Sequence, residues 1–229
     1  MTLPEAARPF NANAKEYDSW YDTSPLFAIE LAAIRATTIR FVRPGLEVGV
    51  GTGRFARALG VKFGLDPALS PLQLAHHRSI IPINGIGEQL PVRTQSIGTV
   101  YLFFTLCFLA DPAAVFTECF RVLKPEGLMV IGFIPRLSPW GKHLSSKGRE
   151  NHPYYRFARF QTVAETGALL AGSGFTILEA WSTLFQPPAP HLAFEHPKPG
   201  ASENAGCCVL LAGKKGGFLE SCQPDHPDN

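Results

Sequence analysis

The sequence predicts an α/β fold, with a mostly parallel sheet covered by helices on both faces. Strand-like and helix-like segments alternate along most of the 229 residues, which is the order that builds such a sheet. Residues 99–104 (TVYLFF) form a dense apolar run, as expected for a central strand buried on both sides. Two strand-like segments near the end, 175–181 and 207–212, are separated only by a Pro-rich loop, which predicts an antiparallel hairpin at one edge of the sheet.

Helical periodicity and capping residues predict the helices. Two short helices are expected between residues 15 and 40, with a break near residues 23–25. A later helix is expected to start with Ser70 as its N-cap, because Pro71 suits the first helical position. The other helices are expected at residues 54–59, 112–123 and 162–173. The strands before the hairpin are expected at residues 46–50, 62–66, 80–84, 99–104 and 128–134.

Three segments fall outside this alternation. Residues 1–13 are expected to be a loose start, and residues 135–153, rich in Pro, Gly, Ser and Lys, a mobile insertion. The polar tail from residue 216 is expected to be disordered. We expect residues 1–215 to form one domain, with N-terminal lid helices at about 14–40 and an insertion at about 135–160.

Composition narrows the class of protein. Apolar residues make up 45% of the chain and charged residues 17%, so the chain is globular. The net charge of +2, without a basic stripe, gives no reason to expect nucleic acid as a partner. The N-terminus lacks the apolar core of a signal peptide and no run of about 20 apolar residues exists, so a cytoplasmic protein without a membrane span is expected. The five cysteines form no CxxC pair, which favours free thiols and no metal site.

The stretch GLEVGVGTGRF, residues 45–55, carries glycines at alternate positions: Gly49, Gly51 and Gly53. Bare backbone between a strand and a helix lets a ligand approach closely and meet free N–H groups. The dinucleotide pattern GxGxxG does not fit, because the third glycine comes one position early and Arg54 takes its place. Glu47 beside the loop would repel a pyrophosphate and suits a cationic ligand. An ordinary tight turn is the alternative interpretation of the glycines.

Asp66 follows thirteen residues after Gly53, at the end of the second predicted strand, in GLDPALSPLQLA. An acid at this place can accept hydrogen bonds from both hydroxyls of a ribose, although Asp66 could also be a helix N-cap. The ligand therefore has a ribose, tolerates a carboxylate and needs no phosphate. S-adenosylmethionine fits, since it combines adenosine, a sulfonium and an α-ammonium group.

These motifs resemble those of the class I S-adenosylmethionine-dependent methyltransferases, in the type 11 group that includes quinone-biosynthesis methyltransferases. The resemblance covers roughly residues 17–215 and five motifs: LEVGVGTGRF, GLDPALSPLQLA, NGIGEQLPV, SIGTVYLFFTLCFLADP and VLKPEGLMVIGF. It implies a Rossmann-like sheet of seven strands in the order 3-2-1-4-5-7-6, with strand 7 antiparallel. It also implies S-adenosyl-L-methionine as cofactor, S-adenosyl-L-homocysteine as product and no metal.

The resemblance further implies which residues surround the cofactor. Their expected roles are the methionine part for Gly49, Gly51 and Gly53, the ammonium group for Glu47, the ribose for Asp66, the adenine for Pro67, Gly87 and Glu88, the cofactor face for Phe103, and a lid for Tyr17, Trp20 and Tyr21. Three departures stand out. Ile86 replaces the usual acid that bonds the adenine amino group, and Gly98 replaces the acid that often begins the fourth strand. Cys107 lies where many relatives carry a histidine. Cys107 could be a nucleophile or a soft-metal ligand, or a small buried residue.

The expected reaction needs little acid–base help. Methyl transfer from a sulfonium is an in-line displacement, to which positioning can contribute about 7–11 kcal/mol, so no catalytic residue is assigned. In NHPYYRFARF, residues 151–160, Tyr155 and Arg159 are expected to contact a planar or anionic small-molecule acceptor, against the alternative of an ordinary surface loop. A cofactor-binding module without turnover, serving as a regulatory or partner subunit, and a nicotinamide-dependent oxidoreductase are the competing functions. The oligomeric state stays open.

Overall fold

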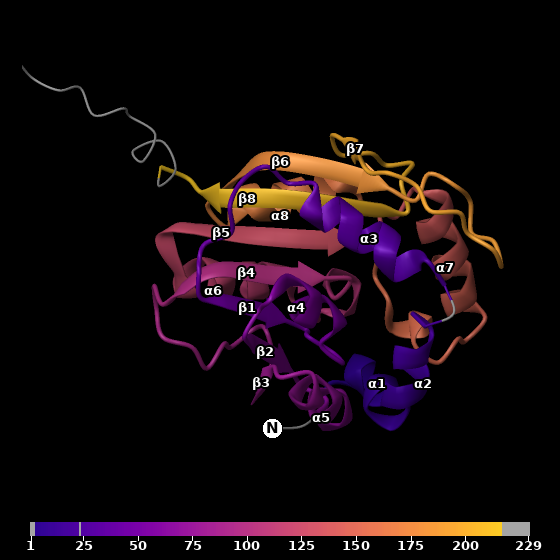
Figure 1. Ribbon diagram of the computed structural model, residues 1–229, viewed down its shortest axis with the longest axis horizontal. Helices are drawn as coiled ribbons and strands as arrows, with labels where there is room; N and C mark the ends of the chain where they lie inside the picture. Colours follow the sequence, from indigo (N-terminus) through magenta and orange to yellow (C-terminus); the bar gives the residue numbers. More distant parts are fainter. Residues whose placement is uncertain (1–2, 23, 217–229) are drawn as a thin grey trace, which may run out of the picture.

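The computed structural model describes residues 3–22 and 24–216, which form one eight-stranded sheet with helices on both faces (Figure 1). The strand order is β3-β2-β1-β4-β5-β8-β6-β7. The strands are β1 (Gly45–Val48), β2 (Phe63–Asp66), β3 (Ile81–Asn84), β4 (Ile97–Phe103), β5 (Leu123–Phe133), β6 (Phe175–Thr183), β7 (Lys198–Pro199) and β8 (Cys207–Lys214). The predicted order 3-2-1-4-5-7-6 is confirmed, with β8 as its seventh strand; the two-residue β7 adds one strand at the edge.

Pairing directions also follow the prediction. The first five strands pair in parallel, whereas β8 lies antiparallel to both β5 and β6. The predicted edge hairpin is therefore confirmed. Since the parallel strands all run one way, the ends of β1, β2 and β4 meet at one edge of the sheet, which is where α/β proteins of this kind bind ligands.

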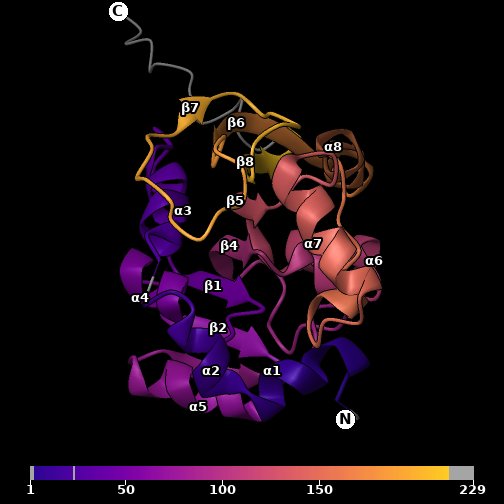
Figure 2. The same cartoon turned by 90° about the vertical axis from the view of Figure 1, so that its right-hand side faces the viewer.

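Helices cover both faces of the sheet (Figures 1 and 2). They are η1 (Glu5–Ala7), α1 (Arg8–Ala12), α2 (Ala14–Ser19), α3 (Leu26–Arg35), α4 (Arg54–Leu59), α5 (Leu69–His77), η2 (Leu106–Phe108), α6 (Pro112–Val122), α7 (Pro139–Arg149), η3 (Tyr155–Phe157) and α8 (Val163–Gly172). One apolar core joins α6 and α8 to the sheet, and a second joins α3, α4 and α5 to the other face. Cys207 and Cys208 belong to different cores, so their side chains point to opposite faces, as expected in a strand.

Local signals explain several helix boundaries. Asp111 caps α6 by accepting the Ala114 N–H bond at 3.1 Å, with Pro112 at the first helical position. Thr162 and Glu165 form a reciprocal capping box at the start of α8. The predicted Ser70 cap is wrong: Ala68 is the N-cap of α5, and the Ser70 N–H instead donates to the Asn11 side chain at 3.0 Å.

Two segments expected to lack regular structure are helical. Residues 5–12 form η1 and α1, and residues 139–149 form α7. Helix α7 begins with Ser138 as its cap and is held by Trp140, whose indole N–H donates to the Gln186 carbonyl at 2.8 Å. The Gly and Ser residues of this segment suggested a loop. Gly141, however, has a packing role within the helix, because a Cβ at this position would lie 2.2 Å from the Pro135 carbonyl oxygen. The strand expected at residues 128–134 begins earlier, because β5 starts at Leu123, directly after α6 ends at Val122.

Two expectations concern the ends of the chain and the membrane. The disordered tail predicted from residue 216 lies almost wholly outside the described residues. Within residues 3–22 and 24–216, no helix has both the length and the apolar character needed to cross a bilayer.

Candidate functional site

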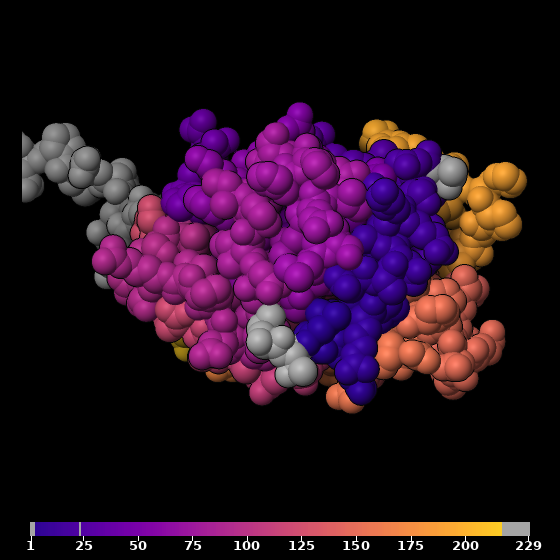
Figure 3. Space-filling model, turned by 90° about the horizontal axis from the view of Figure 1, so that it is seen from below, coloured from indigo at the N-terminus to yellow at the C-terminus, as the bar shows by residue number. Residues whose placement is uncertain are grey.

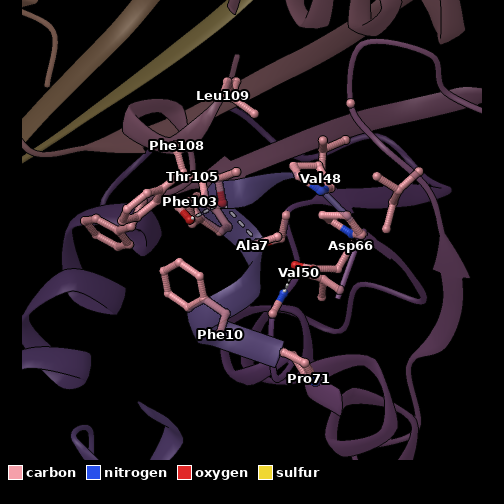
Figure 4. A pocket seen from close by; sticks show the side chains of 18 of the residues that line it. Ala7, Phe10, Val48, Val50, Asp66, Pro71, Phe103, Thr105, Phe108 and Leu109 are labelled. Carbon is pink, nitrogen blue, oxygen red and sulfur yellow. Dashed lines mark hydrogen bonds between the residues drawn. The ribbon is translucent and has the colours of Figure 1, made fainter. Parts of the chain in front are cut away.

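A cavity of about 690 Å³ opens at the carboxyl edge of the sheet, a size and place typical of small-molecule sites. Its wall comes from the glycine loop after β1, the end of β2, the segment after β4, the N-terminal helices and the segment around η3. Figure 4 shows Phe10 and Phe108 on one side of this cavity and Asp66 with Val48 on the other. The structure thus brings residues that are more than 90 positions apart in the chain around one space.

The glycine loop has backbone angles that favour glycine. Gly49, Gly51 and Gly53 have φ values of 74°, 52° and 81°, in the left-handed region that side chains avoid. Gly49 and Gly51 line the cavity, but Gly53 does not. A Cβ on Gly53 would lie 3.0 Å from the Cβ of Ala75 in α5. Gly53 therefore shapes the loop and its packing against α5. It does not line the cavity, so the direct cofactor contact expected of it is not seen.

Asp66 ties the glycine loop to the turn after β2. Its Oδ2 accepts the Gly51 N–H bond at 2.9 Å, and its Oδ1 accepts the Ala68 N–H bond at 2.8 Å. Burial raises the pKa of Asp66 to about 6, against the two N–H bonds, which lower it. Asp66 is not the N-cap of α5, which is Ala68. Each carboxylate oxygen retains a lone pair for a ligand hydroxyl in the cavity that Asp66 lines.

Glu47 is the second carboxyl group of the cavity wall. It is 2% exposed, and its Oε2 has no hydrogen-bond partner among the described residues. Burial raises the pKa of Glu47 well above its usual range; the Ala56 backbone N–H lowers it, and the charge of Asp66 raises it further. A buried, unpaired carboxylate of this kind would be stabilised by a cation. The site therefore fits the ammonium group of S-adenosylmethionine.

The residues expected around an adenine lie together. Pro67, Ile86, Gly87 and Glu88 all line the cavity, although the Ile86 side chain has no polar atom. Gly87 allows close approach of the chain to the sheet, since a Cβ there would lie 3.1 Å from Val48 and Val115 side-chain atoms. Phe103, the last residue of β4, also lines the cavity, as expected.

The N-terminal helices close one side of the cavity. Tyr17 and Tyr21 line it, whereas Trp20 lies outside and packs against Tyr17 and Tyr154 with ring centroids 5.2 Å away in both cases. Phe10 packs against Tyr17 and Tyr154 at 4.9 and 4.8 Å. Figure 3 shows these N-terminal residues as an indigo band between the purple part of the sheet domain and the orange insertion.

A charged network fastens α2 to the glycine loop. Asp18 of α2 accepts bonds from Arg54 Nε and Nη2, both at 2.8 Å, and from Arg78 Nη2 at 2.7 Å. Arg78 also donates to the Thr52 carbonyl at 2.7 Å, and the Thr52 hydroxyl donates to Asp18. Although burial raises the pKa of the Asp18 carboxyl, the bonds from Arg54, Arg78 and Thr52 hold it well below its usual range.

The two residues expected at the acceptor differ in position. Arg159 lines the cavity and its backbone N–H donates to the Cys107 carbonyl at 2.7 Å, but Tyr155 is not part of the wall. Burial raises the pKa of Cys107 to about 12, so its thiol is neutral. Cys107 does not line the main cavity, and it borders a separate void of about 10 Å³. In the described part of the chain, no group of three or more His, Cys, Asp or Glu side chains could hold a metal ion.

Sequence reasoning missed part of the wall. Phe10 and Thr105 line the cavity, and the Thr105 hydroxyl lies 3.2 Å from the Gly49 carbonyl, to which it donates. The Pro9 in α1 is a helix-start signal that could have indicated order before residue 14. No local pattern could have placed Thr105 under Gly49, because that contact joins positions 56 residues apart.

Comparison with known proteins agrees with this geometry. Residues 46–131 match the family described as a methyltransferase domain. An uncharacterized protein of Mycobacterium tuberculosis is 46% identical over 190 residues, which cover 82% of this chain and 67% of that protein. A demethylmenaquinone methyltransferase of Corynebacterium kroppenstedtii is 30% identical over 135 residues, covering 56% of this chain and 58% of the relative.

A solved structure from Thermotoga maritima extends the likeness to the whole fold. It is described as a SAM-dependent methyltransferase and possible histamine N-methyltransferase, and it superposes with a TM-score of 0.84 at 30% identity. The superposition covers 92% of this chain and 100% of that one. With the strand order, the glycine loop and the two cavity carboxylates described above, these matches show that the chain belongs to the class I S-adenosylmethionine-dependent methyltransferases.

Proposed function

We propose that this enzyme transfers the methyl group of S-adenosylmethionine to a small-molecule acceptor by in-line displacement. One observation carries the proposal: the cavity extends beyond the residues assigned to the cofactor. Its further wall includes aromatic and basic side chains: Phe10, Phe104, Phe108, Arg156, Phe157 and Arg159. A cofactor alone would leave this wall without a ligand, so it supports a bound acceptor.

We assign the cofactor contacts by the chemistry of each side chain. Glu47 would bind the ammonium group and Asp66 the ribose hydroxyls, as argued from their burial and free lone pairs. The remaining cofactor contacts would come from Tyr17, Gly49, Gly51, Pro67, Gly87, Glu88 and Phe103. When bound, the cofactor supplies an electrophilic methyl group on a cationic sulfur. Gly53 would act through the shape of the loop.

The residues of this chain contribute mainly position and exclusion of water. The Cys107 thiol is neutral and outside the main cavity, so it is neither a base nor a nucleophile in this proposal. A general base typically adds about 10²–10⁴-fold, less than positioning can provide. The N-terminal helices, the sheet and the segment around η3 all line one cavity, which supports residues 1–215 acting as a single domain.

The names of two relatives support a small acceptor. The Thermotoga structure is described as a possible histamine N-methyltransferase, and the Corynebacterium relative acts on demethylmenaquinone by its name. Arg159 would contact the acceptor, since it lines the cavity and is exposed. Tyr155 does not line the cavity, so it would affect the acceptor only indirectly, through residues of the cavity wall.

The test is turnover against a panel of amines, phenols, quinols and carboxylates, measured as release of S-adenosylhomocysteine. We expect release with at least one acceptor, and a raised Michaelis constant in Arg159→Ala. Binding of S-adenosylhomocysteine without release for any acceptor would favour the second candidate, a cofactor-binding module that serves as a regulatory or partner subunit. An unchanged Michaelis constant in Arg159→Ala would remove Arg159 from the acceptor site.

A further inference from the structure

Residues 154–160 carry two arginines that the cofactor contacts leave unused. Arg156 and Arg159 both line the cavity and are exposed. In the described part of the chain neither arginine forms an ion pair, although Arg156 Nη1 donates to Asn151 Oδ1 at 3.3 Å. The third arginine of the wall, Arg54, is already paired with a carboxylate of α2. The cavity wall therefore presents two guanidinium groups without a counter-ion.

The segment that carries the two arginines is fixed at both of its ends. Tyr154 and Phe160 are only 3% and 5% exposed. Between them, the Arg159 backbone N–H donates to the Cys107 carbonyl at 2.7 Å, which ties the segment to η2. Helix α7 packs closely on the same segment, since a Cβ on Gly148 would lie 2.5 Å from one of its carbonyl oxygens. The backbone therefore holds both guanidinium groups at the cavity wall.

Aromatic rings share this part of the wall with the arginines. Phe10, Phe108 and Phe157 line the cavity, and Figure 4 shows Phe10 and Phe108 on the same side of it. These two rings pack edge to face with centroids 5.1 Å apart, and the Arg156 guanidinium lies 4.6 Å from the Phe157 centroid. Rings of this kind pack well against a further flat apolar group. The wall thus combines an apolar surface with neighbouring cations.

We propose that the acceptor is a flat, apolar molecule that carries one carboxylate group. Arg156 and Arg159 bind the carboxylate, and the neighbouring phenylalanine rings contact the apolar body. The inference rests on the proposed function, since it names the class of acceptor for the same cavity. A guanidinium presents its N–H donors in a planar fork that matches the two oxygens of a carboxylate. The counter-ion that both arginines lack in the protein would thus come from the acceptor.

Four carboxyl groups also line the cavity, and they limit the charge of the acceptor. Glu47, Asp66 and Glu88 are assigned to the cofactor, which leaves Glu5 of η1. Glu5 is exposed, so water and salt screen its charge. It would still repel a doubly charged phosphate more than a singly charged carboxylate. An amine, in contrast, would lie beside two guanidinium groups of its own charge. A single carboxylate fits this set of charges best.

The test is calorimetry on the full chain saturated with S-adenosylhomocysteine. The probes are the anion phenylacetate, its neutral counterpart 2-phenylethanol and the cation 2-phenylethylamine. We expect phenylacetate to bind about 3- to 10-fold more tightly than the alcohol, the range that two exposed ion pairs give, and the amine to bind most weakly. Failure of phenylacetate to bind, equal binding of phenylacetate and the alcohol, or a preference for the amine would overturn the proposal.

Substitution of the two arginines tests their charge and their shape separately. Arg156→Gln and Arg159→Gln should each reduce the preference for phenylacetate, and the double variant should abolish it. Arg159→Lys keeps the charge but loses the planar fork, so it should retain part of the preference. Both side chains are exposed, so the affinity for S-adenosylhomocysteine should stay unchanged in all these variants. A full preference in the double variant, with intact cofactor binding, would contradict the inference.

Arg93→Gln is the matched control, because Arg93 is exposed in the loop between β3 and β4 and does not line the cavity. It should retain the full preference for phenylacetate. An equal loss in Arg93→Gln would show that the overall charge of the protein selects the anion, and would contradict the role given to the two arginines of the wall.

Added salt tests the same contacts without a variant that must fold. Sodium chloride from about 0.02 M to about 0.5 M screens exposed charges, so the preference of the unmodified chain for phenylacetate over the alcohol should shrink. A preference that salt leaves unchanged would overturn the proposal. Because binding is measured without turnover, the expected preference without methyl transfer to any acceptor would sink the proposed function alone. Methyl transfer to neutral acceptors, unaffected in the double variant, would sink this inference alone.

Discussion

Arg54 donates a hydrogen bond to each carboxylate oxygen of Asp18, with Nε–Oδ1 and Nη2–Oδ2 distances of 2.8 Å each. Arg54 is the first residue of α4, directly after the glycine loop, and Asp18 belongs to α2, whose Tyr17 lines the cavity. The pair is largely shielded from water, with side chains 17% and 14% exposed. It therefore couples the position of the N-terminal helices to the loop that would hold the cofactor.

Asp18→Asn should weaken both the fold and the cofactor site. The loss of a charged acceptor shared by Arg54 and Arg78 is expected to lower the free energy of unfolding by about 1.5–3 kcal/mol, and to weaken S-adenosylhomocysteine binding about tenfold. The pKa of Asp18 is lower in the folded than in the unfolded chain. Its stabilising contribution is therefore present above about pH 4 and lost as the pH falls further. The melting temperatures of Asp18→Asn and of the unmodified protein should therefore become equal as the pH is lowered.

Asp22→Asn is the control for this pair. Asp22 also bonds Arg54, at 2.7 Å, but its side chain is 60% exposed, so the change in unfolding free energy should stay within about 0.5 kcal/mol. Equal effects of both substitutions would show that the buried geometry of Asp18 is not what fastens α2.

The two glycines at 51 and 53 should fail in different ways. Gly53→Ala combines a positive φ with a close contact to Ala75, and should lower the free energy of unfolding by about 1–3 kcal/mol. Gly51→Ala meets nothing within 4 Å but lies on the cavity wall. It should lose about 1 kcal/mol of stability and bind S-adenosylmethionine at least about tenfold more weakly. Denaturant unfolding and calorimetry separate the two effects; the reverse pattern would contradict these assignments.

Glu47→Gln should raise the stability of the ligand-free protein and lower its affinity for S-adenosylmethionine. The pKa of Glu47 is raised in the folded chain, so its ionisation destabilises the ligand-free fold increasingly as the pH rises through that value. The glutamine variant should melt at a higher temperature at neutral pH, yet bind S-adenosylmethionine about 10- to 100-fold more weakly.

The affinity of the unmodified protein should fall as the pH drops from about 7.5 to about 5, because Glu47 and Asp66 must both be ionised to bind. Only the part due to Asp66, whose pKa is about 6, should remain in Glu47→Gln. If the affinity for S-adenosylmethionine changed neither with pH nor in Glu47→Gln, Glu47 would be excluded from the ammonium site.

Phe10→Ala should loosen the N-terminal helices. The Phe10 ring packs against Tyr17, Phe108 and Tyr154 with centroids 4.8–5.1 Å apart, and each such pair contributes about 0.5–1.5 kcal/mol. We expect faster amide hydrogen exchange in residues 5–19 and a several-fold weaker binding of S-adenosylhomocysteine. Phe194→Ala, at a ring that is 51% exposed, should change neither. Unchanged exchange in Phe10→Ala would mean that α1 is held without this ring.

Prediction from the sequence succeeded where the position of a residue depends on the order of strands along the chain. Glu47, the glycines and Asp66 lie at the ends of consecutive strands, so the parallel sheet alone brings them to one edge. It failed where long-range contacts decide. Helix α1 has five residues, too few to be stable alone, and it depends on the partners of Phe10. Arg54 looked like a departure from a glycine pattern, and its role appeared only with Asp18, 36 residues earlier.

Titration calorimetry of the purified chain with S-adenosylhomocysteine, S-adenosylmethionine and NADH tests the central claim most directly, namely that Glu47 and Asp66 hold a cationic sulfur nucleoside beside the glycine loop. We expect one molecule of each sulfur nucleoside to bind per chain, no heat with NADH, and loss of binding in a Glu47→Gln, Asp66→Asn double variant that still unfolds cooperatively. Binding of NADH with no response to either sulfur nucleoside would contradict the account.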